Sequence, residues 1–286
     1  MVLNSLCAFF LVLTILSFWV VNKRLITCAL YLAAVALALV TQRVSWMGLI
    51  SLGAFLAGFI LVNRPSFSKA LRSLGYLILV AVGVALCLHI APGFHGWEMI
   101  SECKLSPTST PYTLCFNFDK ISLGIFILIS TSGLLSHTPG EWRRSLFSAF
   151  FFSLIGVAIL LILVWSIGYV RWEPKWPAFT PVWVVANLLF TCVIEEAIFR
   201  GFIQNKLTGL LSAFKWGKWA ALIIASVLFG LVHFPGGLPF VFLSTIAGLI
   251  YGASYLAARR LEASILTHFV INFVHLLGFS YPALQM

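Results

Sequence analysis

Residues 191–207 read TCVIEEAIFRGFIQNKL, and they place two adjacent glutamates inside an apolar stretch. The apolar run extends over about residues 181–204, long enough for a helix to cross a bilayer. A charged side chain at the bilayer centre costs about 2.5–3.5 kcal/mol on insertion scales. Two adjacent glutamates at this position are therefore expected to have a structural or functional role. Capping of a short interfacial helix is disfavoured, because apolar residues continue on both sides of the pair.

The composition of the whole chain supports a lipid environment. Of 286 residues, 61% are hydrophobic and 9% are charged, whereas soluble domains carry about 25% charged residues. We predict an all-α, polytopic transmembrane bundle of about ten spans, with eight to ten as the range because the fifth and eighth are short. The predicted spans are 3–21, 25–42, 45–62, 73–92, 119–136, 145–169, 181–204, 219–234, 238–257 and 263–280.

The basic residues orient this bundle. With the N-terminus outside and ten alternating spans, 13 of the 18 Lys and Arg residues lie inside and five lie outside, as the positive-inside rule requires. The net charge of +10 is therefore explained by the membrane, and no nucleic acid is expected as a partner. We expect a multi-pass protein of a bacterial inner (plasma) membrane with both termini outside.

Polar residues are distributed unevenly along the chain. Residues 1–140 are interpreted as transmembrane scaffold helices with an outside loop at 93–118, and residues 141–286 as the catalytic transmembrane domain. Cys103 and Cys115 share the outside loop, so a disulfide between them is left open. The second half holds nearly every polar residue placed inside the membrane, and the function is predicted to lie there.

The two glutamates have different neighbours on a helix. Glu196 and Arg200 are four residues apart, so they share a face and can pair. We expect this supporting pair to hold the helix geometry. Glu195 lies about 100° away around the helix. A carboxylate in a low-dielectric site can act as a general base near neutral pH.

Two later spans supply imidazole and amide groups at helical spacing. Phe229 and His233 are four residues apart, as are His268 and Asn272, and His275 continues the second stripe. A polar stripe on a membrane helix is expected to face the bundle interior. The alternative interpretations are a packing role for His233 and interhelical hydrogen bonds for the stripe.

The candidate residues are predicted to lie at comparable depths. With a rise of about 1.5 Å per residue from the inside end of each helix, Glu195 lies about 16 Å deep, His233 about 22 Å and His268 about 12 Å. All three fall in the inner and middle membrane. A modest helix tilt would bring them together.

Such a set could hydrolyse a peptide bond. Glu195, helped by His233, would deprotonate a water, while His268 and Asn272 would donate hydrogen bonds to the developing oxyanion. Glu195, His233 and His268 could alternatively hold zinc, because two histidines and one glutamate form a known catalytic zinc set. No H-E-x-x-H motif is present, and the prediction is that no cofactor is required.

Three ordered motifs resemble those of the CAAX protease and bacteriocin-processing family of intramembrane endopeptidases. They are E-E-x-x-x-R, F-x-x-x-H and H-x-x-x-N, formed here by Glu195, Glu196 and Arg200, by Phe229 and His233, and by His268 and Asn272. The resemblance covers about residues 181–280. It implies an all-helical membrane endopeptidase with Glu195 and His233 activating water and with a metal-free glutamic mechanism favoured over a metal-dependent one.

The implied substrates are membrane-embedded or lipid-anchored proteins or peptides in the bilayer. CAAX-type processing, removal of a sorting tail and removal of a leader remain open. Two other classes of protein are weighed against the protease. A proton-coupled transporter also uses intramembrane Glu, His and Arg, but transporters often show internal repeats and none is visible. A non-catalytic immunity or scaffold protein of the same fold is the second alternative, which the intact motif set disfavours.

Overall fold

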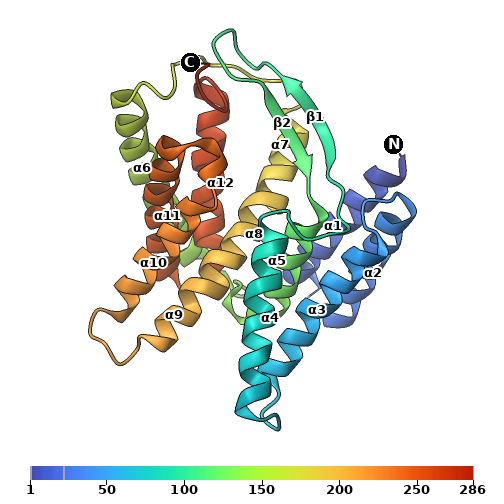
Figure 1. The fold of residues 1–286 in the computed structure, drawn as a ribbon. Helices are drawn as coiled ribbons and strands as arrows, with labels where there is room; N and C mark the ends of the chain where they lie inside the picture. Colours follow the sequence, from blue (N-terminus) through green and yellow to red (C-terminus); the bar gives the residue numbers. More distant parts are fainter. Residues whose placement is uncertain (1, 22, 286) are drawn as a thin grey trace. The chain divides into compact units, whose positions relative to one another are not determined.

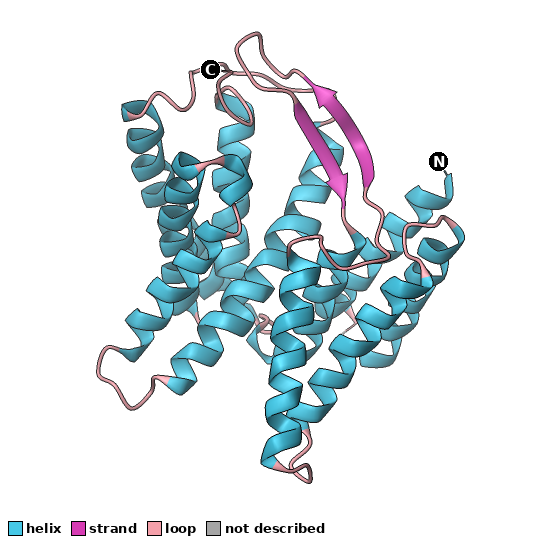
Figure 2. Cartoon of the chain, in the orientation of Figure 1, coloured by secondary structure: helices cyan, strands magenta, loops and turns pink. Residues whose placement is uncertain are grey.

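The computed structural model describes residues 2–21 and 23–285, and 73% of it is helical. The predicted all-α bundle is confirmed (Figures 1 and 2). The chain forms two compact units: unit 1 comprises Met1–Glu98 and Cys115–Ser130, and unit 2 comprises Met99–Leu114 and Thr131–Met286. The assignment of 1–140 as scaffold and 141–286 as catalytic domain stays a prediction.

The core of unit 1 combines leucine and isoleucine side chains with aromatic rings. Tyr31 packs edge-on against Phe126, with ring centroids 5.4 Å apart, and Phe55 stacks on the same ring at 6.0 Å. Ring pairs of this geometry contribute beyond their buried area. The helices are α1 (Val2–Val20), α2 (Arg24–Val40), α3 (Trp46–Asn63), α4 (Lys69–Cys87) and α5 (Phe118–Thr131).

Unit 2 contains the remaining helices. Among them α6, α11 and α12 pack against one another, and α10 packs on α11. The elements are the short η1 (Ser132–Leu134), α6 (Pro139–Ser166), α7 (Thr180–Val185), η2 (Ala186–Cys192), α8 (Val193–Glu196), η3 (Ala197–Gln204), α9 (Asn205–Leu210), α10 (Gly217–Leu231), η4 (Phe234–Gly236), α11 (Leu238–Ala258) and α12 (Leu261–Gly278).

Two carboxylates fix the starts of α6 and α12. Thr138 and Glu141 form a capping box, and Pro139 occupies the first turn, where its missing N–H costs nothing. At the start of α12 the buried Glu262 accepts hydrogen bonds from the backbone and hydroxyl of Ser136, at 2.7 and 2.8 Å. The chain entering α6 is thereby tied to α12.

Gly230 allows α10 to approach α11 closely. A Cβ at Gly230 would lie 1.9 Å from Thr245 Oγ1 and 2.7 Å from the Val241 carbonyl oxygen. We expect Gly230→Ala to destabilise the protein by about 1–3 kcal/mol through overpacking, measured as a lower thermal midpoint in detergent. Gly53→Ala is the matched control, because nothing lies within 4 Å of that position. Equal midpoints for the two variants would contradict the tight contact.

The outside segment predicted as a loop at 93–118 contains a two-stranded sheet. Its strands are β1 (Trp97–Cys103) and β2 (Tyr112–Phe116), visible as the magenta arrows of Figure 2. Cys103 and Cys115 are free thiols. Each lies near a different end of the paired strands, since the Glu102 backbone N–H bonds the Thr113 hydroxyl and Trp97 packs on Phe116.

Seven helical segments of the described residues are long and apolar enough to cross a membrane, which supports an integral membrane protein. They are α1, α3, α4, α6, the continuous helix Thr180–Leu210, α11 and α12. The other three predicted spans also form helices, but α2, α10 and α5 are only 17, 15 and 14 residues long. Their crossing of the bilayer and the outside position of the termini stay predictions.

Candidate active site

The two glutamates occupy one α-helical turn between two π-helical segments. The helix Thr180–Leu210 is continuous, and α8 (Val193–Glu196) lies between the π-helices η2 and η3. π-Helical turns are rare and are often found at functional sites. The wider turns therefore flank the residues that the sequence singled out.

Glu196 connects two of the predicted motifs. Its Oε2 lies 3.2 Å from Nε of Arg200, as the four-residue spacing predicted, and its Oε1 lies 2.9 Å from Nδ1 of His268. All three side chains are buried. Because a carboxylate can only accept, Nδ1 of His268 carries the proton in this bond. Glu196 therefore orients the imidazole as well as the arginine, which the sequence did not reveal.

Arg200 is enclosed by polar and aromatic groups. Its Nη2 donates to the carbonyl oxygen of Gly248 at 2.8 Å. The guanidinium carbon lies 4.8 Å from the ring centre of Phe229 and 5.6 Å from that of Tyr251. Desolvated cation–π contacts of this kind contribute about 2 kcal/mol. Phe229, the first residue of the F-x-x-x-H motif, thus packs against the arginine of the first motif.

One turn further along, Gln204 repeats the contact that Arg200 makes with α11. Its Nε2 donates to the Gly252 carbonyl oxygen at 3.2 Å. A Cβ at Gly252 would lie 2.7 Å from Oε1 of Gln204, so the missing side chain permits the approach. α11 is thereby held against the helix that carries the glutamates.

His268 faces Glu195 with its second ring nitrogen. Nε2 lies 4.0 Å from Oε2 of Glu195, which is too long for a direct hydrogen bond. Tyr251 stacks on the imidazole with ring centroids 4.4 Å apart and planes at 14°. The ring is fixed by Glu196 at one edge and by Tyr251 on one face, so Nε2 is directed at the space beside Glu195.

His233 lies just after the end of α10. Its Nδ1 is 2.7 Å from the Phe229 carbonyl oxygen, so Nδ1 acts as the donor and Nε2 is the basic nitrogen of the neutral ring. The ring packs against Phe229 at 4.8 Å and Phe240 at 5.3 Å between centroids. The protonation pattern suits a proton acceptor at Nε2.

Asn272 is held by a residue that the sequence did not indicate. Its Nδ2 donates to Oδ1 of Asn187 at 3.3 Å and lies 3.9 Å from Sγ of Cys192. The Cys192 thiol also donates to Asn187, at 3.4 Å. The amide of Asn272 is thus anchored to η2. Its second contact is to sulfur, which is a weak acceptor, so a stronger acceptor can replace it.

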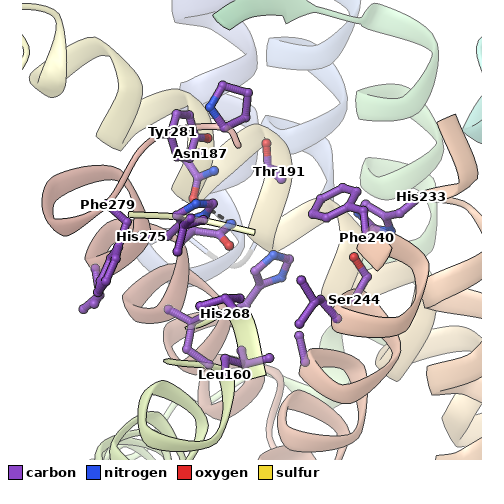
Figure 3. A pocket seen from close by; sticks show the side chains of 18 of the residues that line it. Leu160, Asn187, Thr191, His233, Phe240, Ser244, His268, His275, Phe279 and Tyr281 are labelled. Carbon is purple, nitrogen blue, oxygen red and sulfur yellow. Dashed lines mark hydrogen bonds between the residues drawn. The ribbon is translucent and has the colours of Figure 1, made fainter. Parts of the chain in front are cut away.

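One cavity of about 320 Å³ in unit 2 brings the four predicted catalytic residues together. Glu195, His233, His268 and Asn272 all line it. Glu196 and Arg200 lie behind this surface. Figure 3 shows Asn187, Thr191, Ser244 and His268 around the space, with Phe240 beside His233. The rest of the wall is largely aliphatic and aromatic and comes from α6, α11, α12, β2 and the segments that follow α6 and α12.

The alternative zinc set is not gathered as a ligand sphere. Among residues 2–21 and 23–285, no group of three His, Cys, Asp or Glu side chains could hold a metal ion. Nδ1 of His233 is hydrogen-bonded to the Phe229 carbonyl oxygen. Nδ1 of His268 is hydrogen-bonded to the Glu196 carboxylate. The donor set does not fit zinc in this arrangement.

These observations define a class of protein: it has a membrane-spanning helical fold and a buried site of carboxylate and imidazole groups. The family model described as Type II CAAX prenyl endopeptidase Rce1-like matches residues 176–274, which are 99 of the 286 residues. The match confirms the resemblance predicted from the three motifs, and the family implies a protease. Comparisons with curated proteins and with solved structures gave no significant match.

Proposed function

We propose that this protein is an intramembrane endopeptidase that cleaves membrane-embedded or lipid-anchored proteins or peptides by a glutamate-activated water. The observation that carries the proposal is the convergence of Glu195, His233, His268 and Asn272 on one cavity in unit 2. The family match to residues 176–274 supports the same class of reaction. The predicted setting is a bacterial inner membrane.

The proposed reaction begins with a water beside Glu195. The carboxylate takes one proton while the water oxygen attacks the carbonyl carbon of the substrate, and His233 assists through Nε2. The electrons of the C=O bond move to oxygen, and the tetrahedral intermediate then collapses with cleavage of the C–N bond. Glu195 returns its proton to the leaving amine. The products are a carboxylic acid and an amine.

His268 is proposed to stabilise the oxyanion. With Glu195 as carboxylate and His268 as imidazolium, the two carboxylates balance the guanidinium of Arg200 and the imidazolium. A buried cluster without net charge avoids a large desolvation cost. Nε2–H of His268, fixed through Glu196, then donates to the oxyanion. Preorganised donors of this kind are usually a large contribution to catalysis.

Asn187 is proposed to be a positioning residue for Asn272. Asn187→Ala removes the acceptor 3.3 Å from Asn272 Nδ2, a bond of about 1–1.5 kcal/mol, and kcat should fall about tenfold with KM unchanged. Asn63→Ala is the control, because Asn63 is exposed and its Nδ2 donates to the Phe59 carbonyl oxygen of its own helix. An effect on KM alone, or on neither constant, would refute this role.

A cellular comparison tests the proposed function. Termini of membrane proteins are mapped in cells that produce the wild type, Glu195→Gln or no protein. New termini are expected only with the wild type, and the cleaved sequences identify the substrate. Identical termini in all three samples, together with an effect of the mutation on solute uptake, would contradict the proposed protease function. They would favour the transporter alternative.

A further inference from the structure

Three segments outside the helices are joined at one end of the cavity. They are residues 104–114, 169–175 and 279–285, which we name the cap. Backbone bonds connect Thr110 N–H to Ala283 at 3.0 Å and Gln285 N–H to Thr108 at 2.8 Å. Further bonds connect Ser280 to Arg171 at 2.9 Å and Leu284 to Tyr169 at 3.2 Å. In Figure 1 the segment that follows α12 lies beside the turn between β1 and β2.

Side chains reinforce the cap. The Thr108 hydroxyl donates to the Glu173 carboxylate, and Lys104 Nζ donates to Oε1 of Gln285 at 2.8 Å. Hydrogen bonds from Ser106 and Thr108 hold the pKa of the Glu173 carboxyl below its usual value. The carboxylate therefore stays ionised at neutral pH and continues to accept these bonds. The cap is a built structure with its own network of contacts.

The cap contributes walls to the cavity that contains Glu195. Tyr112 and Leu114 from β2 line the cavity, as do Tyr281 and Pro282 from the end of the chain. The ring centroids of Tyr112 and Tyr281 are 5.0 Å apart. All four residues lie outside the segment 176–274 that matches the family model. This end of the cavity is therefore formed by residues outside the matched segment.

The chemistry of this end is apolar. The cap residues in the lining are Tyr, Leu, Val, Phe and Pro, and none of those described is charged: Tyr112, Leu114, Tyr169, Val170, Phe279, Tyr281 and Pro282. An apolar pocket favours a hydrophobic group through the area removed from water. It disfavours a charged side chain, which would lose its hydration without a partner.

We propose that Tyr112 is a specificity-determining residue that limits the size of the apolar side chain that a substrate places at the cap end of the cavity. This inference rests on the proposed protease function. The ring of Tyr112 is held between Tyr281 and Phe179, at centroid distances of 5.0 and 6.3 Å. Because the ring is held on both sides, it limits the length of the pocket at this end. Removal of the ring would lengthen the pocket.

The test uses membrane-anchored synthetic peptides in detergent micelles, with the sequence found by terminus mapping and with Ala, Leu, Phe or Trp at each residue flanking the cleaved bond. For one of these positions, Tyr112→Ala should shift the ratio of kcat/KM for Trp over Ala about tenfold towards Trp, the range for a change of pocket size. Tyr76→Ala is the matched control, because Tyr76 lies exposed on α4 and should leave every ratio unchanged.

A second variant keeps the inference testable if Tyr112→Ala does not fold. Leu114→Phe narrows the same end of the cavity and should shift the ratio in the opposite direction. Unchanged ratios in folded Tyr112→Ala or in Leu114→Phe overturn the inference, while cleavage by the wild type and its loss in Glu195→Gln still support the protease. If the wild type cleaves none of the peptides, including the mapped sequence, both proposals fall.

Discussion

Glu195→Gln is expected to lower kcat by about 10²–10⁴-fold, the usual contribution of a general base. The amide keeps the size and hydrogen-bonding capacity of the side chain but cannot take a proton. The His268 ring should stay in place, because Glu196 and Tyr251 hold it. The measurement is single-turnover cleavage of a mapped substrate by the purified protein, with the thermal midpoint recorded in the same detergent.

The control for this variant is Glu98→Gln, which removes a carboxylate from an exposed position of β1. It should retain wild-type kcat. Retention of more than about a tenth of the activity in Glu195→Gln, with folding intact, is incompatible with general-base catalysis by this residue.

Arg200→Met is expected to destabilise the protein by about 3–5 kcal/mol, the usual cost of breaking a buried pair from one side. The substitution removes the guanidinium that pairs with the buried Glu196 carboxylate and also removes the donor to Gly248. Arg200→Lys should also destabilise, because a point ammonium cannot reproduce the planar fork. Arg64→Met, at an exposed residue after α3, is the control.

A double-mutant cycle separates charge from packing in this prediction. Glu196→Gln combined with Arg200→Met removes both charges, so the double variant should be more stable than Arg200→Met alone. Activity should stay low in the double variant, because Nδ1 of His268 loses its charge-assisted hydrogen bond to the Glu196 carboxylate, which orients the ring. Strictly additive losses of stability in the two single variants would mean that the pair is not coupled.

The membrane fold was predictable because its signal is local. Each of the ten apolar segments in the sequence forms a helix, since about 20 apolar residues are sufficient to define a span. The pairing of Glu196 with Arg200 was predictable for the same reason, as it depends only on a four-residue spacing. The sheet of β1 and β2 was missed, because a few alternating residues among prolines and serines give a weak strand pattern.

Contacts between distant segments could not be predicted from the sequence. The bond from Glu196 to His268 joins residues 72 positions apart, and Tyr251 carries no motif that would mark it as the stacking partner of that imidazole. The cap is more distant still, because Lys104 and Gln285 are 181 positions apart. Such contacts depend on the packing of whole elements, and single-residue patterns do not encode them.

The π-helical segments change which residues of the helix Thr180–Leu210 point in the same direction. On a wheel with about 100° per residue, Asn187 and Glu195 are eight positions apart and fall about 80° from each other, yet both line the same cavity. A π-turn holds more residues than an α-turn, so each residue of η2 advances by a smaller angle. A wheel projection of residues 180–210 therefore misassigns inward and outward faces, and alignments across this helix should be anchored on α8.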